Sequence, residues 1–161
     1  MWRAARQRFG GGVEQGAISV IAALLAYLPV AHLHLADGFW SSITAIAVTQ
    51  GRFHDSAQLG QRQFIGAAVG GGVGLCAAVL CGSALWVYAG AVFLSIYLCA
   101  LINRRDSGQL AGITATIILL VPHTASAEQT ALARLGEVAL GAAMGLVVSW
   151  LAHFLHRKTE M

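Results

Sequence analysis

The two residues best placed to do chemistry are Arg134 and Glu137, near the start of a long apolar segment. They occupy positions i and i+3, so on a helix their side chains share a face and can form an ion pair. An ionisable side chain inside a bundle of membrane helices is a functional candidate, because its burial there is costly. A guanidinium also binds carboxylates through two parallel hydrogen bonds. Arg134 is therefore a candidate anion-binding residue; the alternative is an interfacial arginine neutralised by its local partner.

Further residues are candidates for the same substrate site. Arg62 lies near the cytoplasmic start of another predicted helix, and its positive charge would attract an anion. Two threonines could bond to substrate or to the backbone of their own helices, which is the commoner use of threonine in a helix. Trp40 either anchors a helix at the membrane interface or lines the site. The predicted substrate-binding residues are Arg62, Arg134, Glu137, Thr44, Thr114, Trp40 and Gln50.

No pattern in the sequence is typical of an enzyme or a metalloprotein. There is no catalytic triad, no glycine-rich phosphate loop and no pair of acidic residues placed for general acid and base catalysis. The cysteines, Cys76, Cys81 and Cys99, lie in apolar segments and lack the C-x-x-C spacing of a zinc site. We therefore predict no catalytic residue, no cofactor, no metal and a function that is not enzymatic.

The composition is typical of a membrane protein. Of the 161 residues, 57% are hydrophobic and 11% are charged, and the mean hydropathy is +0.69. Soluble domains carry about 25% charged residues, so the soluble class is excluded. The net charge is +3, but the basic residues are clustered between apolar segments. That placement orients a membrane protein and does not indicate nucleic-acid binding.

The apolar segments and the breaks between them predict one all-α membrane domain over residues 1–161, with six transmembrane helices. The first segment is too long for the apolar part of a signal peptide. With both termini in the cytoplasm, the Lys and Arg residues fall on the cytoplasmic side, as the positive-inside rule requires, except Arg134 at the start of the sixth helix. The predicted helices cover residues 14–35, 38–52, 59–81, 84–102, 108–122 and 130–154.

The second and fifth helices are predicted to be short. As helices, residues 39–50 and 110–121 would each cover about 18 Å, whereas the hydrocarbon core is about 30 Å thick. Short helices at corresponding positions of two repeats indicate a binding site near the membrane midplane.

An internal repeat relates the two halves, residues 14–81 and 84–154. Each half has three spans, so the two enter the membrane from opposite sides and form inverted repeats. Glycines at every fourth position also let helices approach closely, and the predicted packing residues are Gly66, Gly70, Gly74, Gly141 and Gly145. The repeated motifs are Ile-Thr-Ala at 43–45 and 113–115, then Arg62 or Arg134, then Gly-Ala-Ala-x-Gly at 66–70 and 141–145.

The same segments resemble a known family. Residues 38–50 read Gly-Phe-Trp-Ser-Ser-Ile-Thr-Ala-Ile-Ala-Val-Thr-Gln, and residues 111–118 read Ala-Gly-Ile-Thr-Ala-Thr-Ile-Ile. With Ser56, Arg62 and Gly66 after the first, and Arg134, Glu137 and Gly141 after the second, the chain resembles the FUSC family over most of residues 14–155. This family comprises fusaric-acid-resistance-like and aromatic acid exporter proteins.

The resemblance implies export of small organic anions, aromatic acids among them, across the bacterial inner membrane. The plant aluminium-activated malate channels look like distant relatives, and similarity to them implies an anion path past Arg62 and Arg134. Many family members have a cytoplasmic domain or a second membrane half, so we expect this chain to be a minimal unit that forms a homo-oligomer, a dimer. The alternative function is a non-transporting scaffold or accessory subunit of a larger membrane complex.

Overall fold

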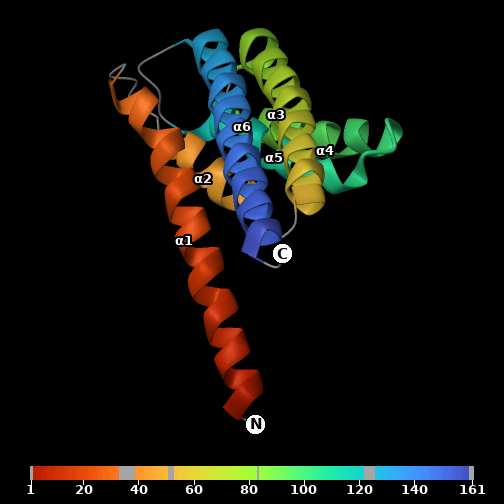
Figure 1. The fold of residues 1–161 in the computed structure, drawn as a ribbon. Coiled ribbons are helices and arrows are strands. Elements are labelled where there is room, and N and C mark those ends of the chain that lie inside the picture. Colours follow the sequence, from red (N-terminus) through yellow and green to blue (C-terminus); the bar gives the residue numbers. More distant parts are fainter. Residues whose placement is uncertain (1, 33–38, 51–52, 83, 122–125, 160–161) are drawn as a thin grey trace. The chain divides into compact units, whose positions relative to one another are not determined.

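The computed structural model is built from helices over the residues that it describes (Figure 1). It describes the backbone of residues 2–32, 39–50, 53–82, 84–121 and 126–159, and, within these ranges, the side chains of residues 12–155 except Ala127. The all-α class and the six helices are confirmed. The helices are α1 (Trp2–His32), α2 (Phe39–Val48), α3 (Phe53–Cys81), α4 (Leu85–Leu101), α5 (Arg105–Leu120) and α6 (Ala127–Thr159).

Three of these helices are long and apolar enough to cross a membrane. The qualifying stretches are Gly12–His32 of α1, Phe53–Cys81 of α3 and Glu128–Leu155 of α6. Helices α2 and α4 are apolar but have only 10 and 17 residues, and α5 has 16 residues with charges in its first turn. At the usual helical rise, α2 covers only about 15 Å. The six-span topology and the inverted orientation of the halves stay predictions.

The chain divides into two compact units, each described by itself. Unit 1 consists of Met1–Gly60 and Leu140–Met161, and unit 2 consists of Gln61–Ala139. Unit 1 therefore contains α1, α2, the first turns of α3 and the second part of α6. Unit 2 contains the rest of α3, then α4, α5 and the start of α6. The units do not coincide with the two halves of the predicted repeat, because α3 and α6 each contribute to both units.

The breaks between the helices of unit 2 occur at residues that leave the helical conformation easily. After α3 ends at Cys81, Gly82 has a φ of +77°, which glycine adopts at little cost. At the end of α4, Asn103 N donates to Ala100 O and Arg104 N donates to Cys99 O, which is the pattern of a Schellman motif. Asn103 takes the left-handed position of this motif, with φ 58°. Both turns lie where the sequence predicted a break between spans.

A proline and a capping box explain where α5 ends and α6 begins. Val121 precedes Pro122 and has φ −76° and ψ 125°, the extended conformation that a following proline favours. Gln129 N donates to Ser126 Oγ, and Ser126 N donates to Gln129 Oε1, both at 3.3 Å. This reciprocal capping box satisfies two backbone donors at the start of a helix. It begins α6 at Ala127, before the predicted residue 130.

Several helices are longer than predicted, because a helix can continue through polar residues. Helix α1 begins at Trp2 instead of residue 14, and α3 begins at Phe53 instead of residue 59. Helix α5 begins at Arg105 instead of residue 108, and Asp106 in its first turn interacts favourably with the positive end of the helix dipole. Helix α2, in contrast, is shorter than the predicted range 38–52.

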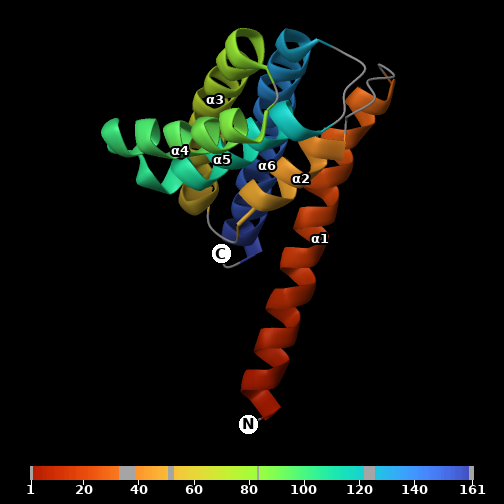
Figure 2. The ribbon, with the colours of Figure 1, turned by 180° about the vertical axis from the view of Figure 1, so that it is seen from behind.

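Neighbouring helices pack in pairs within each unit. In unit 2, α4 and α5 lie side by side in both views (Figure 1 and Figure 2). A Cβ at Gly112 of α5 would lie 3.5 Å from side-chain atoms of Val92 and Ile96 of α4. In unit 1, α1 contacts α2, and Ser41 Oγ donates to the carbonyl oxygen of Ala26 at 3.0 Å. These pairs position the two short helices, α2 and α5, for the contacts described below.

Candidate functional site

In unit 1, the short helix α2 lies directly against two glycines of α6. A Cβ at Gly141 would collide with the carbonyl oxygen of Ser41 and would lie 2.7 Å from Thr44 Cβ. A Cβ at Gly145 would lie 3.0 Å from the carbonyl oxygen of Ala45. The absence of a Cβ at both positions is therefore what allows the two backbones to approach.

In unit 2, the helix α5 lies in the same way against three glycines of α3. A Cβ at Gly70 would collide with the carbonyl group of Ala111. A Cβ at Gly66 would lie 3.2 Å from Ala111 N, and one at Gly74 would lie 3.2 Å from Ala115 Cα. All five glycines predicted to pack helices thus lie against a short helix, three on α5 and two on α2.

The glycine contacts of the two units correspond to one another at a constant displacement along the chain. When a contact of unit 1 is paired with one of unit 2, the residue numbers on the short helices differ by 70, and the residue numbers of the glycines on the long helices differ by 71. The matching contacts are Gly70 with Ala111 and Gly141 with Ser41, and then Gly74 with Ala115 and Gly145 with Ala45.

Burial along the helices follows nearly the same displacement. Residues 60, 66, 67, 70, 71 and 74 of α3 are buried, and so are the residues 71 positions later in α6, at 131, 137, 138, 141, 142 and 145. Residue 56 of α3 and residues 130, 134, 148 and 149 of α6 are buried as well. The repeated letters Gly-Ala-Ala-x-Gly instead match at a displacement of 75 residues. The glycine contacts match at this displacement too, since a Cβ at Gly66 would meet Ser107 O and Ala111 N as one at Gly141 would meet Ser41 O and Ala45 N. The displacement of 71 residues on the long helices is the one at which the Ile-Thr-Ala motifs of the short helices are aligned as well.

Arg134 and Glu137 form the ion pair that their spacing predicts, and the pair is buried. Arg134 Nη1 donates a hydrogen bond to Glu137 Oε2 at 3.1 Å. The two residues are 7% and 8% exposed, and they lie within the stretch of α6 that can cross a membrane. Mutual pairing lowers the cost of removing each charge from water, although it does not abolish that cost.

Arg62 is in a different environment, at the surface of unit 2. Its Nη2 atom lies 3.0 Å from Asp106 Oδ2, and the two side chains are 40% and 68% exposed. Nearby, Arg104 Nη1 donates to Gln61 Oε1 at 3.4 Å. Exposed ion pairs of this kind contribute about 0–1 kcal/mol, because water solvates both charges when they separate. The two arginines predicted to line one path therefore differ in burial and in the strength expected of their pairs.

The contact register changes which residue of α3 corresponds to Arg134. Arg134 lies seven positions before Gly141, and Gln63 lies seven positions before Gly70. By the same count, the counterpart of Glu137 is a glycine, Gly66. Arg62 is one position from Gln63, a rotation of about 100° around the helix. Arg62 and Arg134 thus match in the order of motifs along the chain, but they do not match in the contact register.

The remaining aromatic and hydroxyl residues of the predicted site lie on the short helices. Thr44 and Thr114 occupy matching positions, and each is 4% exposed. Thr114 Oγ1 donates to the carbonyl oxygen of Leu110 in its own helix at 3.0 Å. Trp40 is half-buried, and its ring packs against Phe39 with the ring centroids 4.8 Å apart. These contacts are local to α2 and α5.

A buried polar cluster at the carboxyl end of α2 was largely missed by the sequence analysis. Ser56 Oγ donates to Ser149 Oγ at 2.9 Å and accepts from the backbone N–H of Gln50 at 2.9 Å. Gln15 Nε2 donates to the carbonyl oxygen of Thr49 at 2.9 Å. The side-chain amide of Gln50, a predicted site residue that follows α2, donates to the carbonyl oxygen of Ala47 at 3.4 Å. The available signal was Ser149, the one polar residue between Leu140 and Ala152 of α6.

The comparison with known families agrees with this arrangement of helices and motifs. The family model described as fusaric acid resistance protein-like matches residues 17–148, which include both glycine motifs and the buried ion pair. The chain belongs to this family. No curated protein and no solved structure matches the chain.

Fusaric acid resistance-like proteins form a transporter family, so the predicted family and the general function of membrane transport are supported. The three helices that can cross a membrane agree with that membership. The similarity to the plant malate channels stays a prediction.

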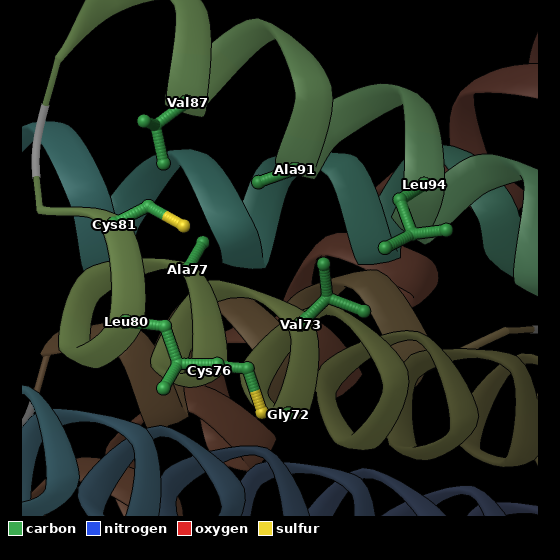
Figure 3. Close-up of a pocket in the computed structure, with 9 residues that line it drawn as sticks. All are labelled: Gly72, Val73, Cys76, Ala77, Leu80, Cys81, Val87, Ala91 and Leu94. Atoms are coloured by element: carbon green, nitrogen blue, oxygen red, sulfur yellow. The ribbon is translucent and has the colours of Figure 1, made fainter.

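This fusaric acid resistance-like chain also has an apolar cavity of about 440 Å³ in unit 2, between α3 and α4 (Figure 3). Ala77 of α3 lies opposite Ala91 of α4 in this view, and the Cys81 thiol lies near Val87. The other lining residues are aliphatic or glycine, apart from Cys76. No charged side chain lines the cavity, so it does not offer the polar groups that an anion would need.

Proposed function

We propose that this protein exports small organic carboxylate anions, aromatic acids among them, across the bacterial inner membrane, with both termini in the cytoplasm. The observation that carries the proposal is the Arg134–Glu137 pair, which is buried within a helix able to cross a membrane. Arg134 is the seventh residue of the stretch Glu128–Leu155, so burying it costs less than burying an arginine at the centre of a membrane helix, which costs about 2.5–3.5 kcal/mol. In a member of a transporter family, substrate binding is the function that accounts for retaining such a charge.

The chemistry of Arg134 favours a carboxylate as the substrate group. Its guanidinium stays protonated at all physiological pH values, is weakly hydrated and presents a planar set of donors that matches a carboxylate. Thr114, on the short helix α5 of the same unit as Arg134, is part of the proposed site, where it would contact the rest of the substrate. Thr44 and Trp40, on α2 of unit 1, stay predicted substrate-binding residues. Arg62, at the exposed surface, would act by attracting anions toward the protein.

Reconstitution into proteoliposomes tests the proposal directly. We expect liposomes containing the protein to release preloaded benzoate or malate faster than empty liposomes. Arg134→Ala should lower the rate by roughly ten- to a hundredfold, the effect of losing a hydrogen bond to a charged group. The matched control is Arg104→Ala, which removes an exposed arginine of the same unit and should leave the rate unchanged.

Two results would contradict the proposal. The first is release of both acids at the rate of empty liposomes. The second is an Arg134→Ala protein with the wild-type rate. Because Arg134→Ala removes the arginine that faces the buried Glu137, circular dichroism and gel filtration should accompany the assay. The double variant Arg134→Gln/Glu137→Gln, which carries neither charge, should also be inactive.

A further inference from the structure

The matching positions of α3 provide an internal control for the ion pair of α6. Both long helices pack glycines on a short helix in the same contact register. In the register that also aligns the two Ile-Thr-Ala motifs, the positions of Arg134 and Glu137 correspond to Gln63 and Gly66, neither of which is charged. Helix α3 therefore makes the same kind of packing contact without an ion pair. It follows that this mode of helix packing does not require the pair on α6.

A lone arginine at this place would bind an anion too tightly for transport. An unpaired charge in apolar surroundings is strongly destabilised, so it would retain any carboxylate that neutralised it. A transport site has to bind its substrate well enough for entry but weakly enough for release. In this protein the carboxylate of Glu137 already lies 3.1 Å from Arg134 Nη1. This carboxylate is the same chemical group as the one proposed for the substrate.

We propose that Glu137 is an intramolecular counter-ion, which the carboxylate of the substrate displaces from Arg134. The inference rests on the proposed export of carboxylates. During binding, one carboxylate replaces another at the guanidinium, so the gain is only the difference between two similar bonds. The displaced Glu137 is then a buried charge without its arginine, which opposes binding. The substrate is released when Glu137 returns to Arg134.

The exposed pair Arg62–Asp106 lacks the property on which this exchange depends. Its side chains are 40% and 68% exposed, so water can solvate Asp106 when another anion approaches Arg62. Separation of the exposed pair therefore opposes anion binding only weakly. The buried pair, at 7% and 8% exposure, is the one in which the internal carboxylate affects substrate affinity.

Benzoate binding and benzoate efflux, measured on the full chain, test the role of Glu137. Glu137→Gln removes the charge and keeps a similar shape. It should lower the Kd and KM for benzoate on the order of tenfold, which corresponds to about 1.4 kcal/mol. The maximal rate should fall as well, because release becomes slower. Glu137→Asp, which keeps a carboxylate with a shorter reach, should change both constants in the same direction but less.

The matched control is Glu128→Gln, which removes an exposed carboxylate from the first turn of the same helix and should leave both constants unchanged. A folded Glu137→Gln protein with an unchanged or higher Kd would overturn the counter-ion role. If Glu137→Gln does not fold, a Kd for Glu137→Asp at or above the wild-type value would also overturn the counter-ion role.

The failure of this inference can be told apart from the failure of the proposed function. Wild-type protein that moves neither benzoate nor malate contradicts the function itself. Wild-type flux without a lower KM in the variants contradicts only the inference.

Discussion

The two short helices pack in the same way, but their carboxyl ends differ in polarity. Helix α2 lies on glycines of α6, and α5 lies on glycines of α3, with matching contacts. At the end of α2, the backbone of Thr49 and Gln50 is bonded by Gln15 and Ser56. The residues of α5 that match Thr49 and Gln50 are Leu119 and Leu120, which carry no polar side-chain group.

The ion pair shows the opposite distribution, because Arg134 and Glu137 of α6 are charged, whereas the matching positions of α3, Gln63 and Gly66, are neutral. The common feature is thus the close backbone contact, which depends on glycine in both units. Each buried polar group needs its own hydrogen-bond partner, whatever glycine contacts lie beside it. The polar groups can therefore differ between the two units although the glycine contacts match. The molecule combines one repeated mode of packing with two different polar sites. The predictions below test each part of this comparison.

The largest effect on stability is expected from Gly70→Ala and Gly141→Ala. Each new Cβ would collide with a carbonyl oxygen, that of Ala111 or of Ser41, so a backbone has to move. Overpacking of this kind costs about 1–3 kcal/mol, and it should appear as a lower unfolding temperature in detergent. The two losses should be similar because the two contacts match.

Gly72→Ala is the control for these substitutions, since a Cβ at Gly72 meets nothing within 4 Å. It should be neutral, or more stable by up to about 1 kcal/mol, because alanine favours a helix over glycine. If only one of Gly70→Ala and Gly141→Ala is destabilising, the two units are not packed alike.

A smaller effect is expected at the polar cluster beside α2. Ser56→Ala and Ser149→Ala should each cost about 0.5–1.5 kcal/mol, the usual value of one hydrogen bond. The double variant should cost less than the sum of the two, since both single changes remove the same bond. The comparison is Ala78→Ser, at the position of α3 that matches Ser149, which should not stabilise the protein. Fully additive losses would show that the two hydroxyls do not interact.

The smallest effect is expected from Asp106→Asn at the exposed ion pair. The loss should be below about 1 kcal/mol, and it should shrink as the salt concentration rises. Unfolding in detergent at low and high salt measures both features. A loss that exceeds that of Ser149→Ala, or one that salt does not change, would contradict the assignment of Arg62 to a solvated surface.

Most of the local structure could be predicted from the sequence. The apolar segments indicated six helices, and the predicted ends of the third and fifth helices, at residues 81 and 122, lie at or within two residues of the observed ends of α3 and α5. The predicted starts of α1, α3 and α5 were too late, because their first turns are polar and carry no apolar signal. The contact between Arg134 and Glu137 was predictable as well, since it depends only on spacing within one helix.

The sequence by itself thus determined the helices and the ion pair, whose causes lie within one or two turns of chain. The tertiary structure decided which glycines lie against which residues of the short helices. In α3, Gly66, Gly70 and Gly74 all fit the same four-residue spacing. Gly70 is paired with Gly141 because it lies against the carbonyl group of Ala111, the residue that the Ile-Thr-Ala motifs align with Ser41. The Ser56–Ser149 bond likewise joins residues 93 positions apart. Such contacts depend on how distant backbones approach one another, which no local pattern of residues specifies.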